Sequence, residues 1–125
     1  MSKKILIADD DKTLLQIISF RIKSWGYEPI TVDNAKDALE KVKSENPDLL
    51  IFDYKLADES GVELLEQVRK INKDTPAFIL TAYPSSKAMH KSQDAHATKF
   101  ILKLHDGASL ANSLQANIEE CLGAP

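Results

Sequence analysis

The chain has 125 residues, of which 43% are hydrophobic and 28% charged, so we expect one globular domain that folds without disulfides or a structural metal. The net charge of −3 gives no reason to expect non-specific binding to nucleic acid, and no apolar run approaches the ~18 residues that a membrane helix needs. The lone Cys121 cannot form an internal disulfide, and Met1-Ser2-Lys3-Lys4 does not resemble a secretory leader, so we expect a cytoplasmic protein.

Short apolar runs alternate along the chain with segments of helical spacing. The runs predict five strands, over residues 4–8, 28–32, 49–52, 77–80 and 99–102. Apolar residues at helical spacing predict helices over 14–25, 35–45, 62–71 and 110–122, and a more polar helix over 84–96. The apolar stripe of the third helix consists of Val62, Leu65, Val68 and Ile71, and that of the last helix consists of Leu110, Leu114, Ile118 and Leu122.

The ends of several helices carry residues that favour starts and stops. Asp11 and Asn34 are suited to cap the first and second helices, because their side chains accept hydrogen bonds from free backbone N–H groups. Gly26 ends the first helix, and the Asn46-Pro47 pair ends the second.

This fivefold alternation predicts an α/β fold: a single doubly wound sheet of five parallel strands with five helices on its two faces. Right-handed crossovers leave few topologies, and we predict the flavodoxin-like strand order 2-1-3-4-5. In that order strands 1 and 3 are neighbours, so Asp9 and Asp10, after the first strand, and Asp53, after the third, should converge.

The predicted strand ends carry an unusual set of polar groups for a protein core. Asp9 and Asp10 end strand 1, Asp53 ends strand 3, Thr81 ends strand 4 and Lys103 ends strand 5. Carboxylates repel one another unless a cation joins them, and Mg²⁺ prefers such oxygen ligands. The set also suits a phosphoryl group. A carboxylate can attack phosphorus to form an aspartyl-phosphate, while a lysine and a hydroxyl bind the phosphoryl oxygens.

These residues closely resemble the receiver domain of two-component response regulators, over essentially all of residues 1–125, with an ordered core of about 4–122. The matching elements are Ile5-Leu6-Ile7-Ala8-Asp9-Asp10-Asp11, Leu50-Ile51-Phe52-Asp53, Gly61, Leu80-Thr81-Ala82 and Phe100-Ile101-Leu102-Lys103. The successive separations between Asp10, Asp53, Thr81 and Lys103 are 43, 28 and 22 residues, as in that family. No single element is specific for this family, but the ordered set with these separations is specific for it.

The resemblance implies a metal-dependent phosphoacceptor site. Asp53 resembles the phosphoacceptor, and Mg²⁺ is the implied cofactor. Asp10 and Asp53 resemble its direct ligands, together with the backbone carbonyl of Lys55, and Asp9 resembles a ligand that acts through bound water.

The resemblance also implies a switch and its partners. Thr81 and Lys103 resemble the phosphate-sensing pair, and Phe100 stands at the aromatic switch position. Phosphorylation in this family remodels the face formed by helix 4, strand 5 and helix 5, through which the domain pairs with itself or with an effector. The implied phosphodonor is a sensor histidine kinase, a phosphotransfer protein or a small phosphodonor. The domain is not expected to bind nucleic acid or membranes directly, nor to be an enzyme beyond its own phosphorylation and dephosphorylation.

Three positions depart from the family pattern. Leu104 follows Lys103 where a proline with a cis bond is usual, so we expect a trans peptide there and the direction of Lys103 is open. Ala57 also replaces a common proline, which should make its loop more mobile. Lys55 and Tyr83, each two residues beyond a site residue, should border the phosphoryl group, and the Lys55 ammonium should approach Asp53.

Two other functions fit parts of the pattern. The missing proline after Lys103 favours a phosphorylation-independent binding module that keeps the fold, a pseudo-receiver, but the complete set of site residues opposes it. A phosphatase resembling the haloacid-dehalogenase class needs a second aspartate two residues after the nucleophile, where this chain has Lys55.

Simpler structural roles also apply to some residues. Phe100 also suits the core as a plain aromatic, and the last apolar stripe suits the core before any dimer contact. His90, His96 and His105 lack metal-ligand spacing and are expected at the surface.

Overall fold

The computed structural model describes residues 2–104 and 106–123 of the chain. Residues 1, 105, 124 and 125 of the predicted domain lie outside these described residues. The prediction that His105 is at the surface falls on one of them. The elements in chain order are β1 (Lys4–Ala8), α1 (Lys12–Ser24), β2 (Glu28–Val32), α2 (Ala35–Glu45), β3 (Leu49–Asp53), α3 (Gly61–Arg69), β4 (Ala77–Thr81), α4 (Ser86–Asp94), β5 (Lys99–Leu102) and α5 (Gly107–Leu122).

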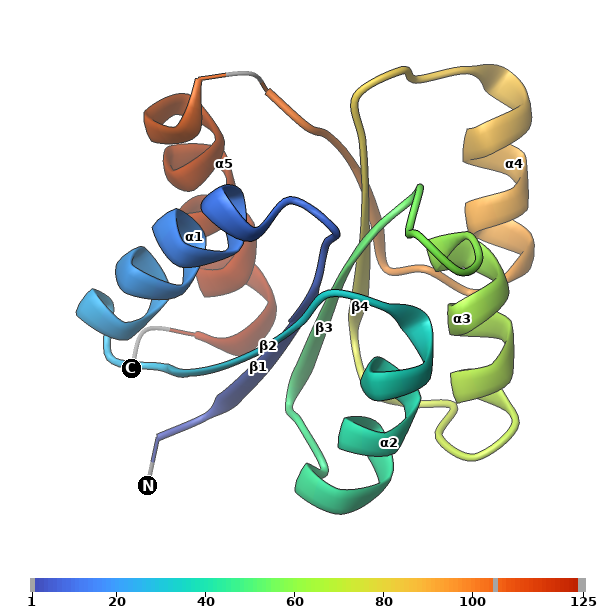
Figure 1. Cartoon of the computed structure of the whole chain (residues 1–125), viewed down its shortest axis with the longest axis horizontal. Coiled ribbons are helices and arrows are strands. Elements are labelled where there is room, and N and C mark those ends of the chain that lie inside the picture. Colours follow the sequence, from blue (N-terminus) through green and yellow to red (C-terminus); the bar gives the residue numbers. More distant parts are fainter. Residues whose placement is uncertain (1, 105, 124–125) are drawn as a thin grey trace.

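The sheet has the predicted topology. Its five strands are all parallel and lie in the order β2-β1-β3-β4-β5. Helices α1 and α5 cover one face, and α2, α3 and α4 cover the other (Figure 1). The predicted flavodoxin-like α/β fold is therefore confirmed. None of the helices in the described ranges is long and apolar enough to cross a membrane.

Alternate residues of the central strands face two separate cores. On β1, Leu6 and Ala8 pack with α2 and α3, while Ile5 and Ile7 pack with α1 and α5. Strand β3 divides in the same way, and all five of its residues are buried. Successive side chains of a strand point to opposite faces, so a continuous apolar run can fill both cores at once.

The predicted helix caps are confirmed. Asp11 accepts a hydrogen bond from the Leu14 N–H, and Asn34 accepts one from the Asp37 N–H. The second helix ends at Glu45, and the left-handed backbone of Asn46 (φ 48°) caps it before Pro47. The polar helix predicted over 84–96 is present as α4, where Ala88 and Ser92 provide the buried side.

Two apolar residues are more exposed than their patterns predicted. Ile71 was placed on the stripe of the third helix, but α3 ends at Arg69 and Ile71 is 54% exposed in the turn that follows. The turn departs from helical geometry ahead of Pro76, which begins the approach to β4. Leu102 is 46% exposed because β5 is an edge strand with a neighbour on one side.

Candidate functional site

The carboxyl ends of the strands bring together most of the predicted site residues. The register pairs Ala8 with Phe52 and Thr81 with Leu102, so the residues that follow each strand meet at one edge of the sheet. Asp9, Asp53 and Thr81 are 2%, 6% and 4% exposed, and they are three of the four buried polar residues among those described. Burial of two carboxylates is costly unless cations or hydrogen bonds compensate, and such sites are usually functional.

Lys103 binds both buried carboxylates. Its ammonium lies 2.9 Å from Asp53 Oδ2 and 2.8 Å from Asp9 Oδ2. Its backbone N–H donates to the carbonyl of Thr81, which holds the start of the β5–α5 loop beside β4. The described residues contain no cis peptide bond, so the 103–104 peptide is trans as predicted. The ammonium thus reaches Asp53 with Leu104 in place of the usual proline.

The pKa values of the three groups are set by burial and by one another. Burial, followed by the charge of Asp9, raises the pKa of Asp53 to about 6, although Lys103 opposes this shift. Burial also raises the pKa of Asp9, against the effects of Lys103 and of the Asp11 N–H that bonds its Oδ1. Burial lowers the pKa of Lys103, but the hydrogen bonds and charges of both aspartates outweigh it, and the net shift is upward. One ammonium therefore only partly relieves the repulsion between the carboxylates.

The carboxylates form a set of ligands suited to a hard cation. Asp9, Asp10 and Asp53 each offer an oxygen, and these oxygens all lie within 4.8 Å of one another. Three carboxylates and one ammonium give a net negative site, and Mg²⁺ takes oxygen ligands while keeping several waters. The residues present therefore fit Mg²⁺. Asp10 is exposed and gives the ion a route from solvent.

A hollow of about 330 Å³ opens beside these groups. It is lined by Asp10, Asp53, Tyr54, Lys55, Thr81, Ala82, Tyr83 and Lys103. Five of the predicted site residues thus face one cavity. Ala82 is small and half-buried, and Tyr83 is 85% exposed at the rim. In the described part of the chain, Lys55 makes no ion pair with Asp53, so the predicted approach of its ammonium stays a prediction.

The two predicted switch residues lie on adjacent strands. The Thr81 hydroxyl accepts a hydrogen bond from the Tyr83 N–H at 3.2 Å, which leaves its own proton free to be donated. The ring of Phe100 is half-buried against the core on the α2 and α3 side of the sheet. It is neither a fully buried core aromatic nor fully exposed.

Gly61 and Asp58 are two residues whose roles the sequence did not reveal. A Cβ at residue 61 would collide with the backbone carbonyl of Asp53, so only glycine fits at this position. The resemblance included Gly61 as a motif element without giving this reason. Asp58 carries no motif signal, yet its carboxylate accepts hydrogen bonds from the N–H groups of Ala35 and Lys36 on α2.

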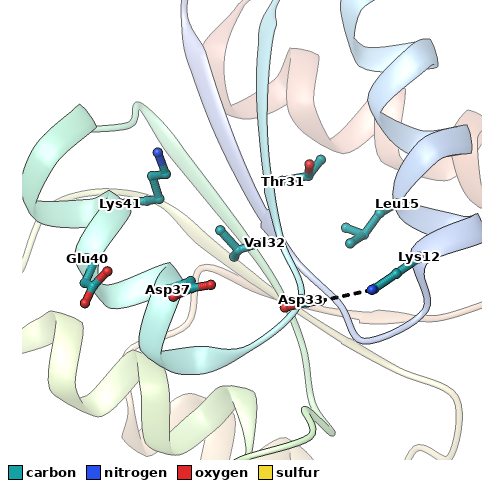
Figure 2. Close-up of a pocket in the computed structure, with 8 residues that line it drawn as sticks. All are labelled: Lys12, Leu15, Thr31, Val32, Asp33, Asp37, Glu40 and Lys41. Atoms are coloured by element: carbon teal, nitrogen blue, oxygen red, sulfur yellow. Dashed lines mark ion pairs between the residues drawn. The ribbon is translucent and has the colours of Figure 1, made fainter.

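A second, larger hollow of about 460 Å³ lies along the edge strand β2, between α1 and α2 (Figure 2). It is lined by Lys12, Leu15, Thr31, Val32, Asp33, Asp37, Glu40 and Lys41. An ion pair within it joins two exposed side chains, Lys12 and Asp33, at 3.8 Å (Figure 2). None of its charged groups is buried, so it lacks the compensated carboxylates that mark the strand-end site.

The histidines stand away from this chemistry. His90 and His96 are exposed, as predicted, and neither belongs to the group of possible metal ligands found in the described residues. His96 has a left-handed backbone (φ 63°) just after α4, and its carbonyl accepts a hydrogen bond from Arg69.

The fold and the site together define a response regulator receiver domain, and the chain belongs to that family. The family's sequence profile, described as the response regulator receiver domain, matches residues 5–115.

Individual relatives agree with this assignment. The chain is 31% identical to a CheY-like response regulator receiver domain protein from Methanospirillum hungatei JF-1, with a TM-score of 0.85 and coverage of 96% of both chains. It is 30% identical to the response regulator TrrA from Thermotoga maritima, solved in complex with Mg²⁺ and BeF, with a TM-score of 0.84 and coverage of 96% and 99%. It is also 30% identical to the transcriptional regulatory protein ZraR of Klebsiella oxytoca over 118 residues, which are 94% of this chain and 26% of ZraR. The chain thus spans about a quarter of that relative's length.

Proposed function

We propose that this receiver domain is a phospho-accepting switch of a two-component phosphorelay, phosphorylated on Asp53. The observation that carries the proposal is the pair of contacts from Lys103 to Asp53 and Asp9, beside a hollow that Asp53 and Lys103 line. A buried carboxylate held by an ammonium beside two further acids is what an Mg²⁺-dependent phosphoacceptor requires.

In the proposed transfer, an Asp53 carboxylate oxygen attacks the phosphorus of the donor. An oxygen–phosphorus bond forms as the donor's bond to phosphorus breaks, and the leaving group keeps that electron pair and takes up a proton. The donor is a phosphohistidine of a kinase or phosphotransfer protein, or a small acyl phosphate. Hydrolysis reverses the modification, because water attacks the phosphorus and releases inorganic phosphate from Asp53.

The other site residues have separate roles in this proposal. Asp10, Asp53 and the Lys55 carbonyl would hold Mg²⁺, and Asp9 would bind it through water. The bound ion would offset the charge on the transferring oxygens. Lys103 would move from Asp53 toward a phosphoryl oxygen, and its remaining bond to Asp9 would keep it oriented.

The output of the proposed switch is a change on the α4–β5–α5 face. The Thr81 hydroxyl would donate to the phosphoryl group, and Phe100 would turn inward from its half-buried position. This face presents Met89 and Leu102 as exposed apolar side chains, and a short Lys99–Glu120 ion pair joins β5 to α5. Such a surface suits a second copy of the domain or an effector.

Receiver domains exchange phosphoryl groups with histidine kinases or phosphotransfer proteins, and we propose such a donor here. The cytoplasmic location, the absence of nucleic-acid and membrane binding, and the lack of turnover of external substrates stay predictions from the sequence.

An NMR titration tests the proposal. Mg²⁺ alone should shift the backbone signals of Asp10, Asp53 and Lys55. Beryllofluoride added with Mg²⁺ should further shift those of Thr81 and Phe100. Shifts confined to the acidic residues would limit the domain to metal binding, and no shift at saturating concentrations would contradict a phosphoacceptor site. Trp25 is a poor reporter, because it lies at the far end of the 13-residue α1, ~20 Å along the helix axis from the site edge.

A further inference from the structure

The loop between β3 and α3 begins directly after Asp53 and carries the carbonyl expected to bind Mg²⁺. Leu56 N–H donates to the Glu59 carbonyl, and Gly61 N–H donates to the Tyr54 carbonyl, so residues 55 and 60 face each other in a narrow bridge. Neither of these bonds uses the carbonyl of Lys55. The loop therefore presents that carbonyl without engaging it in the bridge.

Asp58 stands at the tip of this bridge and reaches across to the amino end of α2. Its Oδ1 accepts the Ala35 N–H at 2.9 Å, and its Oδ2 accepts the Lys36 N–H at 3.2 Å. Asn34, the local cap, accepts the next N–H, that of Asp37, at 2.8 Å. The first four N–H groups of a helix, those of the cap and of the next three residues, have no partners within the helix, and here two of the four are bound by Asp58 from a distant loop.

The charge of Asp58 fits this position. The carboxylate lies at the positive end of the α2 dipole, and the Ala35 N–H is the main cause of a pKa below the ordinary value for Asp58. Asp58 contacts α2, whereas the neighbouring Glu59 accepts a hydrogen bond from the Gln67 side chain of α3. Leu56, buried in the core beneath, is the other anchor of the loop.

We propose that Asp58 is a positioning residue for the metal site: by bonding the amino end of α2, it fixes the β3–α3 loop and thereby the Lys55 carbonyl. This inference rests on the proposed function. The chain has Ala57 where receivers commonly have a proline, so it lacks one restraint on this loop. The two Asp58 bonds supply a restraint of another kind, from outside the loop.

Three variants separate positioning from charge and from helix stability. Asp58→Ala removes both the bonds and the charge. Asp58→Asn removes the charge and keeps one acceptor oxygen, so one of the two bonds to α2 can remain. Asn34→Ala removes a neighbouring α2 bond without touching the loop. Each variant is first compared with the wild type in urea unfolding, to show that it folds.

The first measurement is the dissociation constant for Mg²⁺ from NMR titration. We expect Asp58→Ala to weaken binding about tenfold, at the low end for groups that orient metal ligands. Asp58→Asn should weaken binding less than Asp58→Ala, because its amide oxygen can keep one of the two bonds to α2, and Asn34→Ala should bind normally. Equal weakening by Asp58→Asn and Asp58→Ala, with amide exchange of the loop unchanged in Asp58→Asn, would assign the effect to charge and overturn the inference, as would normal binding by Asp58→Ala.

The second measurement is amide hydrogen exchange in metal-free protein. Asp58→Ala should speed exchange at Leu56 and Gly61, whose N–H groups close the bridge, whereas Asn34→Ala should not. Unchanged exchange at both amides would overturn the inference without reference to the metal. Failure of the wild type to bind Mg²⁺ would instead count against the proposed function, so the two failures are distinguishable.

Discussion

Replacing Asp53 by asparagine should stabilise the metal-free protein at neutral pH. The carboxylate is 6% exposed and lies among two other acids, and its pKa is raised from 3.8 to about 6. Such a rise corresponds to about 3 kcal/mol of unfavourable free energy for the ionised form. Asparagine removes the charge and keeps an oxygen that can accept from Lys103. Because the titration of Asp53 is shared with Asp9 and Lys103, we expect a gain of about 1–3 kcal/mol.

The sign of the effect fixes its pH dependence. Below pH 3.8 Asp53 is protonated in both the folded and the unfolded states, so ionisation costs nothing there. Between pH 3.8 and about 6 Asp53 is ionised in the unfolded chain but still protonated in the folded protein, so the wild type loses stability relative to Asp53→Asn until the folded group also ionises above about 6. The advantage of the variant should therefore grow between pH 4 and pH 7 and then stay constant.

Urea unfolding followed by circular dichroism, in the presence of EDTA, measures this difference. Asp10→Asn is a matched control, because Asp10 carries the same charge at the same edge but is exposed, and its gain should be smaller. Saturating Mg²⁺ should stabilise the wild type more than Asp53→Asn. A variant that is no more stable than the wild type at pH 7, or a gain that does not change with pH, would refute the reasoning.

Three further predictions concern the surroundings of the site. Lys55→Ala should shorten the lifetime of the aspartyl-phosphate several-fold, because Lys55 lines the hollow and its long side chain limits access of water. A dephosphorylation time course measures this lifetime. Equal lifetimes of the wild type and the variant would show that the Lys55 ammonium does not approach the phosphoryl group. Gly61→Ala should cost about 3 kcal/mol or more in urea unfolding, since the new Cβ collides with the Asp53 carbonyl, and normal stability would contradict that contact. His96→Gly should stabilise the protein by about 0.5–1 kcal/mol in urea unfolding, because His96 has a left-handed backbone (φ 63°) that glycine adopts without strain. His90→Gly, within α4, is the control and should destabilise the protein by a similar amount.

The sequence was sufficient for the features that depend on local pattern. Apolar runs of four or five residues predicted all five strands, and their alternation with helices predicted the sheet order. The convergence of Asp9 and Asp53 followed from that order, because parallel strands end at one edge. Asp11 and Asn34 were predictable as caps, since each bonds an N–H three residues along the chain.

The features that sequence reasoning missed depend on contacts between distant segments. Asp58 bonds Ala35, 23 residues away, and no local pattern distinguishes it from a solvated acid in a loop. The bond from Lys103 to Asp9 was missed because it depends on the geometry at the strand ends, where one ammonium reaches both buried carboxylates. Ile71 fitted the helical period, but the chain leaves the helix before it.

The central claim is that Asp53 accepts a phosphoryl group with the help of Mg²⁺. Intact-protein mass spectrometry after incubation with acetyl phosphate tests it most directly, with wild type and Asp53→Asn each treated in Mg²⁺ and in EDTA. We predict that the wild type gains the mass of one phosphoryl group in Mg²⁺ only, and that Asp53→Asn gains none. An unmodified wild type at saturating donor and Mg²⁺, or equal modification of Asp53→Asn, would contradict the claim.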